Sequence, residues 1–343
     1  MKGLRIREIG KLELIEMDVP AVPANHVLLK VNSISICGTD IHEWEGKVPI
    51  TLPRIPGHDF SGTIAEVGKG VHGFEAGQRV VVKPSFPCYA CPACQAGSFE
   101  NCPDTRLIGL NSDGCFREFM AVPAANLIPL PDHVSFEAAS ILEPFTVGLN
   151  AFEKLGLDRT KSFGGSVTIL GQGPIGLGVT RIAAIAGVEV ICAVDVRDNV
   201  LKLARQFGAA YTVNTSGQNA LETILHATGG PTDIVIETAG ASANIGILPA
   251  LVKKGGRIVN IGIFKGIGSI PVEAIVAKGL TIIGIGGNGG KGKYEAVLRL
   301  TGGGVLEPAR LITHRFPFSE ALEAFEVARD KSKNSIKVVV TND

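Results

Sequence analysis

The chain has 343 residues, of which 45% are hydrophobic and 19% charged, and its formal net charge at pH 7 is zero. This length allows two domains, each with its own core, and the composition is typical of a globular protein without a disordered tail. Because no basic run occurs and Arg181 and Glu189 interrupt the longest apolar stretch, neither nucleic acid nor a membrane is an expected partner.

The N-terminal stretch, MKGLRIREIGKLELIE, alternates polar and apolar residues and lacks the apolar block of a signal peptide. We therefore expect a cytoplasmic protein in a reducing compartment. Its seven cysteines are then expected to be thiols or metal ligands rather than disulfide partners.

From the N-terminus to about Pro131 the sequence alternates short β-rich segments with turn residues. Such segments, bounded by Gly, Pro, Asn or Asp, lie at residues 26–35, 62–67, 79–82 and 116–122. This pattern predicts a compact, mostly antiparallel β domain. Two helical stretches are expected to follow, over residues 135–142 and 144–155.

Four cysteines lie in a loop that contains Pro and Gly, with the spacing C-x2-C-x2-C-x7-C: Cys88, Cys91, Cys94 and Cys102. Four thiolates can close a tetrahedral shell around Zn²⁺ and leave no position for a substrate, which indicates a structural role. An iron–sulfur cluster is the nearest alternative, because ferredoxins share the first two spacers and a Pro after the fourth cysteine. The long last spacer and the lack of a second cysteine set favour structural zinc.

A second group of possible metal ligands is dispersed along the chain: Cys37, His58, Asp59 and Glu143. Each member has an ordinary structural interpretation. A cysteine after an apolar strand is usually a small core residue, and a glutamate before a proline suits a helix N-terminus. The residues alone therefore leave open whether these four form a metal site.

After Gly164-Gly165 the sequence alternates strands with helices. Strands are expected at residues 167–170, 190–194, 211–213, 234–237, 257–261 and 280–285, with helices between the first five. Six strands with intervening helices predict an α/β fold with a doubly wound parallel sheet. A last strand, over residues 336–340, could return to the first domain.

The stretch from residue 167 to 195 has the order of a dinucleotide-binding unit: strand, glycine turn, helix, strand and terminal acid. The glycines allow a tight turn, the approach of a pyrophosphate to the backbone and close packing of the helix on the sheet. The free N–H groups of the first helical turn would receive the phosphates. Asp195 can accept both ribose hydroxyls and repel a 2′-phosphate, which favours NAD over NADP. The motif residues before it are Gly171, Gly173, Pro174, Ile175 and Gly176.

Two later loops are candidate parts of the same cofactor site. Gly262, Ile263 and Phe264 follow one expected strand, and Gly286-Gly287 follow the next. Cofactor loops lie at the carboxyl ends of strands in an open α/β sheet. Ordinary turns are an equal alternative for both loops.

Six motifs stand in a characteristic order: ICGTDIH (36–42), PGHDFSG (56–62), the four-cysteine loop, DGCFREF (113–119), LEPF (142–145) and GQGPIGLG (171–178). On these motifs the whole chain resembles the zinc-dependent medium-chain alcohol dehydrogenases, most closely the polyol (sorbitol-like), sugar-acid and threonine dehydrogenase branch. The resemblance implies a Rossmann sheet beside a GroES-like β domain. The implied division is a catalytic domain over 1–148 with a structural-zinc lobe at 85–105, an NAD-binding domain over 149–288, and a C-terminal segment, 289–343, returning to the catalytic domain.

The resemblance further implies two zinc ions per chain, one structural and one catalytic. Cys37 and His58 would bind the catalytic zinc, and Asp59 and Glu143 would bind it directly or through water. The family usually has Glu where this chain has Asp59. The shorter side chain suits a water molecule or a substrate hydroxyl as well as zinc.

In the reaction that the resemblance implies, Thr39 and His42 carry away the substrate proton and hydride passes from a zinc-bound alkoxide to NAD. The implied substrate is a secondary alcohol of a polyol or sugar-derived compound, and L-threonine is the competing substrate. Glu143 favours polyols, because threonine dehydrogenases often carry Asp there, whereas Cys115 favours threonine. A non-catalytic NAD-binding protein is a further alternative. Relatives are generally dimers or tetramers, so a homodimer or homotetramer is expected.

Overall fold

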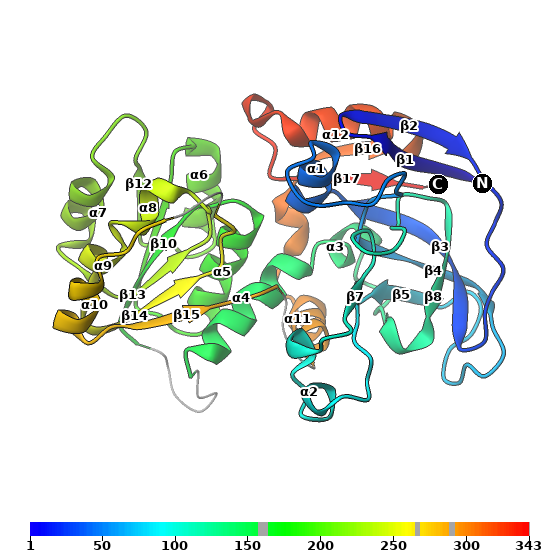
Figure 1. Cartoon of the computed structure of the whole chain (residues 1–343), viewed down its shortest axis with the longest axis horizontal. Helices are drawn as coiled ribbons and strands as arrows, with labels where there is room; N and C mark the ends of the chain where they lie inside the picture. Colours follow the sequence, from blue (N-terminus) through cyan, green and yellow to red (C-terminus); the bar gives the residue numbers. More distant parts are fainter. Residues whose placement is uncertain (157–163, 265–267, 288–291, 343) are drawn as a thin grey trace. The chain divides into compact units, whose positions relative to one another are not determined.

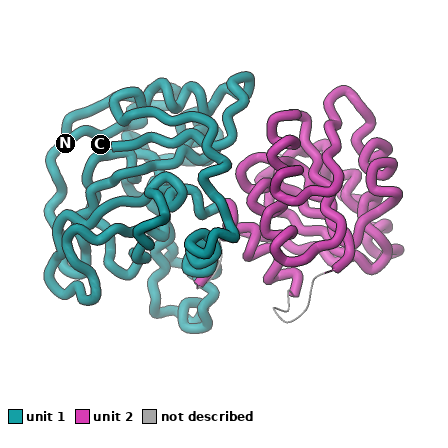
Figure 2. Tube along the Cα trace, turned by 180° about the vertical axis from the view of Figure 1, so that it is seen from behind, with its two compact units in different colours: residues 1–143, 294–343 teal, residues 144–293 magenta. Residues whose placement is uncertain are grey.

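The computed structural model describes residues 1–156, 164–264, 268–287 and 292–342. Figure 2 colours its two compact units, of which one comprises residues 1–143 and 294–343 and the other residues 144–293. The domain limits expected from the sequence, after residues 148 and 288, stay a prediction.

The first unit is built on a sheet with the strand order β16-β17-β3-β4-β5-β9, in which β8 also pairs with β3 (Figure 1). Its ladders are antiparallel except that between β16 and β17, which confirms the expected, mostly antiparallel β domain. The strands are β1 (Lys2–Glu8), β2 (Lys11–Glu16), β3 (His26–Ser35), β4 (Asp59–Val67), β5 (Arg79–Val82), β6 (Ser85–Phe86), β7 (Arg106–Leu107), β8 (Phe119–Pro123), β9 (Leu127–Pro129), β16 (Ile312–Pro317) and β17 (Lys337–Thr341).

Strand β3 is the centre of this sheet because β17, β4 and β8 all pair with it. Its sequence, HVLLKVNSIS, is rich in Val, Leu and Ile, and most of its side chains are buried. The pairing with β17 joins the C-terminal segment to the N-terminal strands of the same unit. Residues more than 300 positions apart in sequence, such as Ser35 and Val339, are thereby register partners.

Aromatic packing holds two helices of this unit against each other. The ring of Phe325, from α12 (Ala321–Arg329), lies edge-on to Trp44, from α1 (Gly38–Trp44), at a centroid distance of 6.1 Å. Phe325 also lies 5.0 Å from Phe116 in the same manner. Such pairs contribute about 0.5–1.5 kcal/mol beyond the burial of their area, so they fix the place of α1. The shorter helices α2 (Pro92–Gln95) and α3 (Phe136–Ala139) and the helix α11 (Lys293–Gly302) complete this part of the chain.

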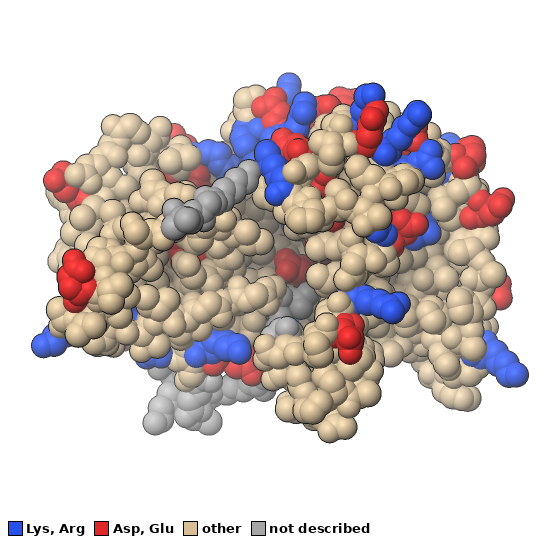
Figure 3. All heavy atoms as spheres, in the orientation of Figure 1, with Lys and Arg blue, Asp and Glu red and all other residues tan. Residues whose placement is uncertain are grey.

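Basic and acidic side chains alternate over β1, β2 and α12 on the face shown in Figure 3. Ion pairs join several of them, including Arg5 with Glu13 and Arg329 with Glu326. The unit thus presents mixed charge on this face. Among the helices in the described part of the chain, none is both long and apolar enough to cross a membrane.

The second unit is a six-stranded parallel sheet with the order β12-β11-β10-β13-β14-β15. This is the order of a doubly wound dinucleotide-binding sheet, so the expected fold class is confirmed. The strands are β10 (Ser166–Leu170), β11 (Val190–Asp195), β12 (Tyr211–Asn214), β13 (Thr232–Glu237), β14 (Val252–Asn260) and β15 (Thr281–Gly284). Its helices are α4 (Glu143–Lys154), α5 (Pro174–Ile185), α6 (Asp198–Gln206), α7 (Ala220–Thr228), α8 (Ser242–Ile245), α9 (Leu248–Leu251) and α10 (Val272–Lys278).

One helix of this unit, α10 between β14 and β15, was missed by the sequence analysis, which placed helices only between the first five strands. The helix buries none of its side chains, and Val272 and Val276 are 66% and 77% exposed. An apolar stripe that faces the core is the usual sequence signal of a helix, and α10 lacks it.

Candidate metal centres and cofactor site

Cys37, His58 and Asp59 form a group whose possible ligand atoms all lie within 4.8 Å of one another. The topology explains the grouping. Strand β3 ends at Ser35, directly opposite Asp59, the first residue of β4. The residues that follow β3 and precede β4 therefore meet at one edge of the pair. A sulfur, a ring nitrogen and a carboxylate are a donor set that suits Zn²⁺.

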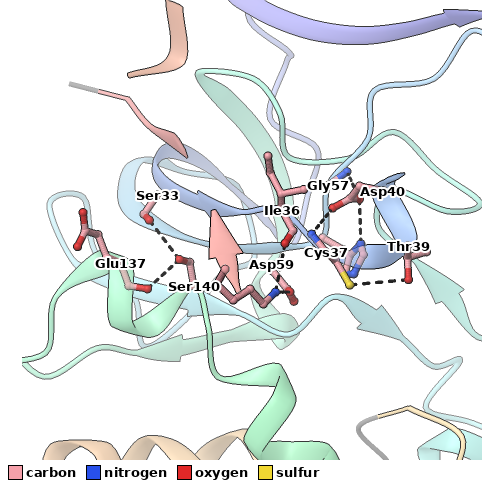
Figure 4. Close-up of polar contacts among 11 residues, drawn as sticks. Ser33, Ile36, Cys37, Thr39, Asp40, Gly57, Asp59, Glu137 and Ser140 are labelled. Atoms are coloured by element: carbon pink, nitrogen blue, oxygen red, sulfur yellow. Dashed lines mark hydrogen bonds and ion pairs between the residues drawn. The ribbon is translucent and has the colours of Figure 1, made fainter. Parts of the chain in front are cut away.

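Asp40, which the sequence analysis missed, ties the two segments of this group together. Its Oδ2 accepts a hydrogen bond of 2.8 Å from the backbone N–H of Cys37, and its Oδ1 accepts one of 3.0 Å from that of Gly57 (Figure 4). The Asp40 side chain is fully buried. The first contact is half of a capping box at the start of α1, and that spacing is the sequence signal that could have identified Asp40.

Asp40 also faces the ring of His58, whose Nδ1 lies 3.4 Å from Oδ1. Among the described residues this buried nitrogen has no hydrogen-bond partner of good angular geometry, so the contact is an electrostatic one. Burial lowers the pKa of His58, but the charges of Asp40 and Cys37 outweigh burial and raise the pKa above its ordinary value. With Nδ1 turned to Asp40, Nε2 is the ring nitrogen available to a metal ion.

The second residue that the sequence analysis missed is Lys337. Its Nζ lies 3.0 Å from Oδ2 of Asp59, and both side chains are almost fully buried. Burial by itself lowers the pKa of Lys337, yet the charges of Asp59 and Cys37 raise it above its ordinary value. No local motif pointed to this pair, because β17 brings Lys337 to the site from 278 positions away in sequence.

Glu143 begins α4 and is half-buried. Burial, and after it the charge of Asp59, raise the pKa of Glu143 to about 7. Within the described residues, the close group of possible ligand atoms contains Cys37, His58 and Asp59 but does not include Glu143. The role of Glu143 as a ligand therefore stays a prediction.

Thr39 and His42 both lie on α1, three positions apart, so they share one face of the helix. Both side chains are partly exposed. The Thr39 hydroxyl oxygen lies 3.7 Å from the sulfur of Cys37 (Figure 4). This arrangement places a hydroxyl next to the possible metal site and a histidine one helical turn further along.

Cys88, Cys91, Cys94 and Cys102 form the second group of possible metal ligands, with all four sulfurs within 4.8 Å of one another. The backbone N–H groups of Cys88 and Cys91 donate to the sulfurs of Cys102 and Cys88, each at 3.3 Å. The N–H of Cys88 is the main cause that lowers the pKa of Cys102 to about 6, whereas burial and the neighbouring thiols raise the pKa of Cys94 to about 12. Four converging sulfurs fit a closed zinc site.

The remaining cysteines, Cys115 and Cys192, are completely buried. Burial raises the pKa of Cys192 to about 12, so its thiol stays protonated near neutral pH. Burial also raises the pKa of Cys115, and the charges of Asp40 and Asp59 add to the effect.

The glycine turn of the second unit lies between β10 and α5. Gly171 has φ +89°, and a Cβ on Gly176 would meet the carbonyl oxygen of Gly171 at 1.9 Å, so the backbone itself requires both glycines. A Cβ on Gly173, by contrast, would meet no atom within 4 Å. Packing inside the protein therefore does not require a glycine at position 173. The absence of a side chain there leaves room for a ligand to approach the backbone. Gly173 caps α5 and Pro174 begins it, as expected for a phosphate-binding helix start.

Asp195 ends β11, and its carboxylate lies against the glycine turn. Its Oδ2 accepts a hydrogen bond of 2.6 Å from the backbone N–H of Gln172, while Oδ1 accepts from the N–H groups of Val196 and Arg197. The guanidinium Nε of Arg197 also lies 3.4 Å from Oδ1. Since Oδ1 is engaged by several donors and Oδ2 by one, Oδ2 has capacity left for a ribose hydroxyl.

The later loops lie at the carboxyl edge of the same sheet, as expected. Gly262 follows β14, and a Cβ there would meet Oε2 of Glu237 at 2.3 Å. Glu237, a buried residue that the sequence analysis missed, accepts hydrogen bonds from the N–H groups of Ala239 and Gly240. Its carboxylate thereby holds the loop after β13, while its backbone carbonyl oxygen accepts the N–H groups of Ile261 and Gly262, which follow β14. Ile263 and Phe264 follow Gly262 in the same loop, and the side chain of Ile263 is 86% exposed. Gly286 and Gly287 follow β15.

Comparison with known proteins agrees with this geometry. Residues 23–132 match the model of the alcohol dehydrogenase GroES-like domain, and residues 174–302 match that of zinc-binding dehydrogenases. An L-threonine 3-dehydrogenase of Legionella pneumophila (strain Corby) is 36% identical over 323 residues, which cover 91% of this chain and 92% of the relative.

Solved structures agree as well. An alcohol dehydrogenase of Escherichia coli CFT073 complexed with NADH is 29% identical, with a TM-score of 0.91 and 99% coverage of both chains. A zinc-binding dehydrogenase of Sinorhizobium meliloti 1021 bound to NADP is 29% identical, with a TM-score of 0.90, and covers 99% of this chain and 98% of its own. Galactitol-1-phosphate dehydrogenase of Escherichia coli is 28% identical, with a TM-score of 0.89, and covers 99% of this chain and all of its own (100%).

The fold and the two groups of possible metal ligands define a zinc-binding oxidoreductase that uses a nicotinamide dinucleotide. The chain belongs to the zinc-dependent medium-chain alcohol dehydrogenase family.

Proposed function

We propose that the protein oxidises a secondary alcohol of a polyol or sugar-derived substrate to the ketone, with NAD as hydride acceptor. The observation that carries the proposal is the grouping of Cys37, His58 and a carboxylate within 4.8 Å, in a chain that also carries a dinucleotide motif. A structural zinc site is closed by four protein ligands. This group offers one sulfur, one imidazole and a carboxylate, so a zinc ion held there would keep a position open for a substrate.

Cys37 and His58 would hold the catalytic zinc, with Glu143 or Asp59 as a further ligand directly or through water. Zinc bound there would lower the pKa of the substrate hydroxyl, and NAD would accept the hydride from the carbinol carbon. The four cysteines from Cys88 to Cys102 would hold a structural zinc. Two zinc ions per chain follow, and a reducing compartment such as the cytoplasm suits both sites because thiolates bind the metal.

The chain's own residues move the proton. Thr39 would accept the hydroxyl proton of the substrate as it passes its own proton to His42, directly or through a ribose hydroxyl. A histidine suits this relay because its unperturbed pKa lies near neutral pH. The overall change balances as alcohol plus NAD⁺ giving ketone, NADH and one proton, which His42 releases.

NAD is the proposed cofactor, and Asp195 supports this choice. A carboxylate beside the glycine turn accepts ribose hydroxyls and repels a 2′-phosphate. We assign Gly171, Gly173, Pro174, Ile175 and Gly176 to the pyrophosphate. The loops with Gly262, Ile263, Phe264, Gly286 and Gly287 are assigned to the nicotinamide half.

L-Threonine is the second candidate substrate, and the name of the Legionella relative favours it. The galactitol-1-phosphate dehydrogenase and the Glu143-Pro144 pair favour a polyol or sugar derivative instead. Both candidates carry a secondary hydroxyl beside another polar group, so the same centre and relay serve either one. Specificity between them depends on contacts around the reacting carbon.

We also propose that the chain forms a homodimer or homotetramer through the second unit. Strand β15 lies at the edge of the six-stranded sheet, and most of its side chains are exposed. Val272, Val276 and Ile282 add exposed apolar surface around it. An open edge strand with apolar neighbours suits pairing with a second copy. Light scattering of Ile282→Lys should then show a monomer, and an unchanged oligomer would contradict this surface.

NAD reduction tests the activity, measured with metal-replete protein on polyols, aldonates, simple secondary alcohols and L-threonine, before and after chelation. Turnover of a polyol or aldonate that the chelator abolishes supports the proposal. Turnover of L-threonine alone keeps the mechanism and replaces the substrate. No turnover with only one zinc per chain favours a non-catalytic NAD-binding protein.

A further inference from the structure

Glu237 is the last residue of β13, the strand that lies between β10 and β14 in the six-stranded sheet (Figure 1). Its side chain is fully buried, although it is an acid at the carboxyl edge, where the candidate cofactor loops begin. It has no part in the proposed zinc site or proton relay. A buried carboxylate is costly unless hydrogen-bond donors surround it, so its partners show what it holds in place.

The donors to the Glu237 carboxylate come from one short segment, the loop after β13 and the start of α8. The backbone N–H groups of Ala239 and Gly240 donate to it at 3.1 and 3.0 Å, and the side-chain amide of Asn244 donates at 2.9 Å. Burial raises the pKa of Glu237, and these hydrogen bonds oppose the rise. A carboxylate accepts from all of these donors, whereas an amide would set its own N–H group against one of them.

Glu237 also lies against the loop that follows β14. Its backbone carbonyl oxygen accepts the N–H groups of Ile261 and Gly262 at 2.8 and 3.0 Å. A Cβ on Gly262 would meet Oε2 of Glu237 and the backbone nitrogen of Gly240, both at 2.3 Å. The carboxylate, the loop after β13 and the loop after β14 are therefore in direct contact, so a change in the carboxylate displaces both loops.

The other side of the loop after β13 is fixed against the glycine turn without the help of this carboxylate. The N–H of Thr238 donates to the carbonyl oxygen of Leu170 at 2.9 Å, and its hydroxyl lies 2.9 Å from the carbonyl oxygen of Gly171. A Cβ on Gly171 would meet the backbone nitrogen of Ala239 at 2.8 Å. The three loops are thus packed backbone to backbone, but only the two later ones depend on the side chain of Glu237.

We propose that Glu237 is a positioning residue for the nicotinamide half of the cofactor. Its carboxylate shapes the loop after β13 and thereby sets the place of the loop after β14, against which that half binds. This inference rests on the proposed assignment of the loop with Gly262 to the nicotinamide half. The glycine turn and Asp195 keep their own contacts, so binding of the adenosine and pyrophosphate groups does not depend on Glu237.

Glu237→Gln keeps the size of the side chain and turns one amide donor toward the donors of the loop. We expect NADH to bind more weakly by about tenfold or more, the factor that corresponds to one hydrogen bond to a charged group. ADP-ribose has the adenosine and pyrophosphate groups without the nicotinamide ring, and its affinity should stay within about threefold of the wild type. Titration calorimetry measures both affinities.

Asp233→Asn is the matched control, because Asp233 lies on the same strand at the opposite edge of the sheet. Its Oδ2 accepts hydrogen bonds from the backbone N–H and the hydroxyl of Ser166, at 2.8 and 2.6 Å. The control should lose stability but keep the ratio of the two affinities. If it weakens NADH binding as much as Glu237→Gln does, stability of the sheet explains the effect and the inference is wrong.

Two further results with Glu237→Gln would overturn the inference. Equal losses for NADH and ADP-ribose would show that the carboxylate supports the whole dinucleotide site, and an unchanged NADH affinity would show that the loops do not need it. Should this variant fail to fold, Asn244→Ala decides, because it removes one donor and leaves the carboxylate in place. Weaker binding of NADH alone, by about threefold or more, supports the inference, and wild-type affinity contradicts it.

The wild-type protein separates this inference from the proposed function. If it binds NADH no more tightly than ADP-ribose, the assumed contact with the nicotinamide half is absent, and the role of Glu237 is refuted with it. If it binds neither ligand, the proposed cofactor site itself is wrong.

Discussion

Oδ1 of Asp40 lies 3.4 Å from Nδ1 of His58, while the other carboxylate oxygen of Asp40 accepts the backbone N–H of Cys37. A single buried side chain thus sets the orientation of both candidate zinc ligands. The usual partner of a metal-binding histidine is such a carboxylate, which fixes the ring and its tautomer. The arrangement explains why the motif from Ile36 to His42 needs an acid at its third helical position.

Asp40→Asn tests this relationship. The amide keeps the size of the side chain but loses the charge that faces His58, so zinc affinity at this centre should fall by about 10- to 100-fold. Chelator competition should show one zinc ion released early and the other retained by the four cysteines. Two zinc ions with unchanged affinities in the variant would contradict the role of Asp40.

The site illustrates what the sequence allowed us to predict. Cys37, His58 and Asp59 were predicted from the resemblance of the two motifs that carry them to a known family, because the residues alone left the metal site open. Lys337 was not, because only the pairing of β17 with β3 brings it there, and no local pattern encodes a partner 278 positions away. Glu237 was missed for a different reason. Its carboxylate binds the backbone of its own loop, and many acids at strand ends look the same in sequence.

The secondary-structure elements, like the site residues, were predicted where a local sequence pattern marks them. Strands buried on both faces, such as β10 with the sequence SVTIL, were predicted from their apolar runs and the glycine turn behind them. Helix α10 was missed because it buries no side chain, so no stripe of core residues marks it. The sequence therefore predicted the strands of the second sheet and missed α10, and in the first unit it also predicted no separate strands at β1, β9 and β16.

Cys91→Ser should remove the structural zinc and leave the catalytic site in place. Three thiolates hold zinc less well than four, and the free energy of metal binding is free energy of folding for the loop around it. We expect one zinc per chain, and a loss of stability of more than about 2 kcal/mol in thermal unfolding. Cys192→Ala is the control, since this buried thiol lies in the core of the other unit and should leave two zinc ions bound. A variant with two zinc ions would refute the assignment.

Asp233 gives the stability of the second unit a defined pH dependence. Partial burial raises the pKa of its carboxyl group, but hydrogen bonds from Ser166 and the pair with Lys253 outweigh burial and hold the pKa below its ordinary value of 3.8. Because the pKa in the folded state is lowered, the carboxylate stabilises the fold above about pH 3.8, and this contribution is lost as the pH falls through the folded-state pKa.

Asp233→Asn should therefore destabilise the protein by about 1 kcal/mol at pH 7, the usual net value of a hydrogen-bonded pair. The difference from the wild type should shrink below about pH 4 in urea unfolding, as the wild-type carboxylate becomes protonated. The exposed Asp18→Asn serves as the control and should match the wild type throughout. A difference between Asp233→Asn and wild type that stays constant with pH would refute the argument.

Asp195→Ala should weaken the preference for NAD over NADP, because the variant loses both the acceptor for ribose hydroxyls and the charge that repels a 2′-phosphate. The same change removes the acid that lies 3.4 Å from Nε of Arg197, so the positive charge of this residue is no longer offset by Asp195 when a 2′-phosphate approaches. The ratio of kcat/KM for NAD to that for NADP should fall by about tenfold or more, as expected when a charge contact is lost on one ligand and gained on the other. Asp198→Asn, three positions further along, removes a neighbouring charge whose carboxylate pairs with Asn214, and should leave the ratio unchanged. If Asp195→Ala keeps the wild-type ratio, discrimination lies elsewhere in the second unit. If both variants lower it equally, the net charge at this edge of the sheet decides the preference rather than the contact of Asp195 with the ribose.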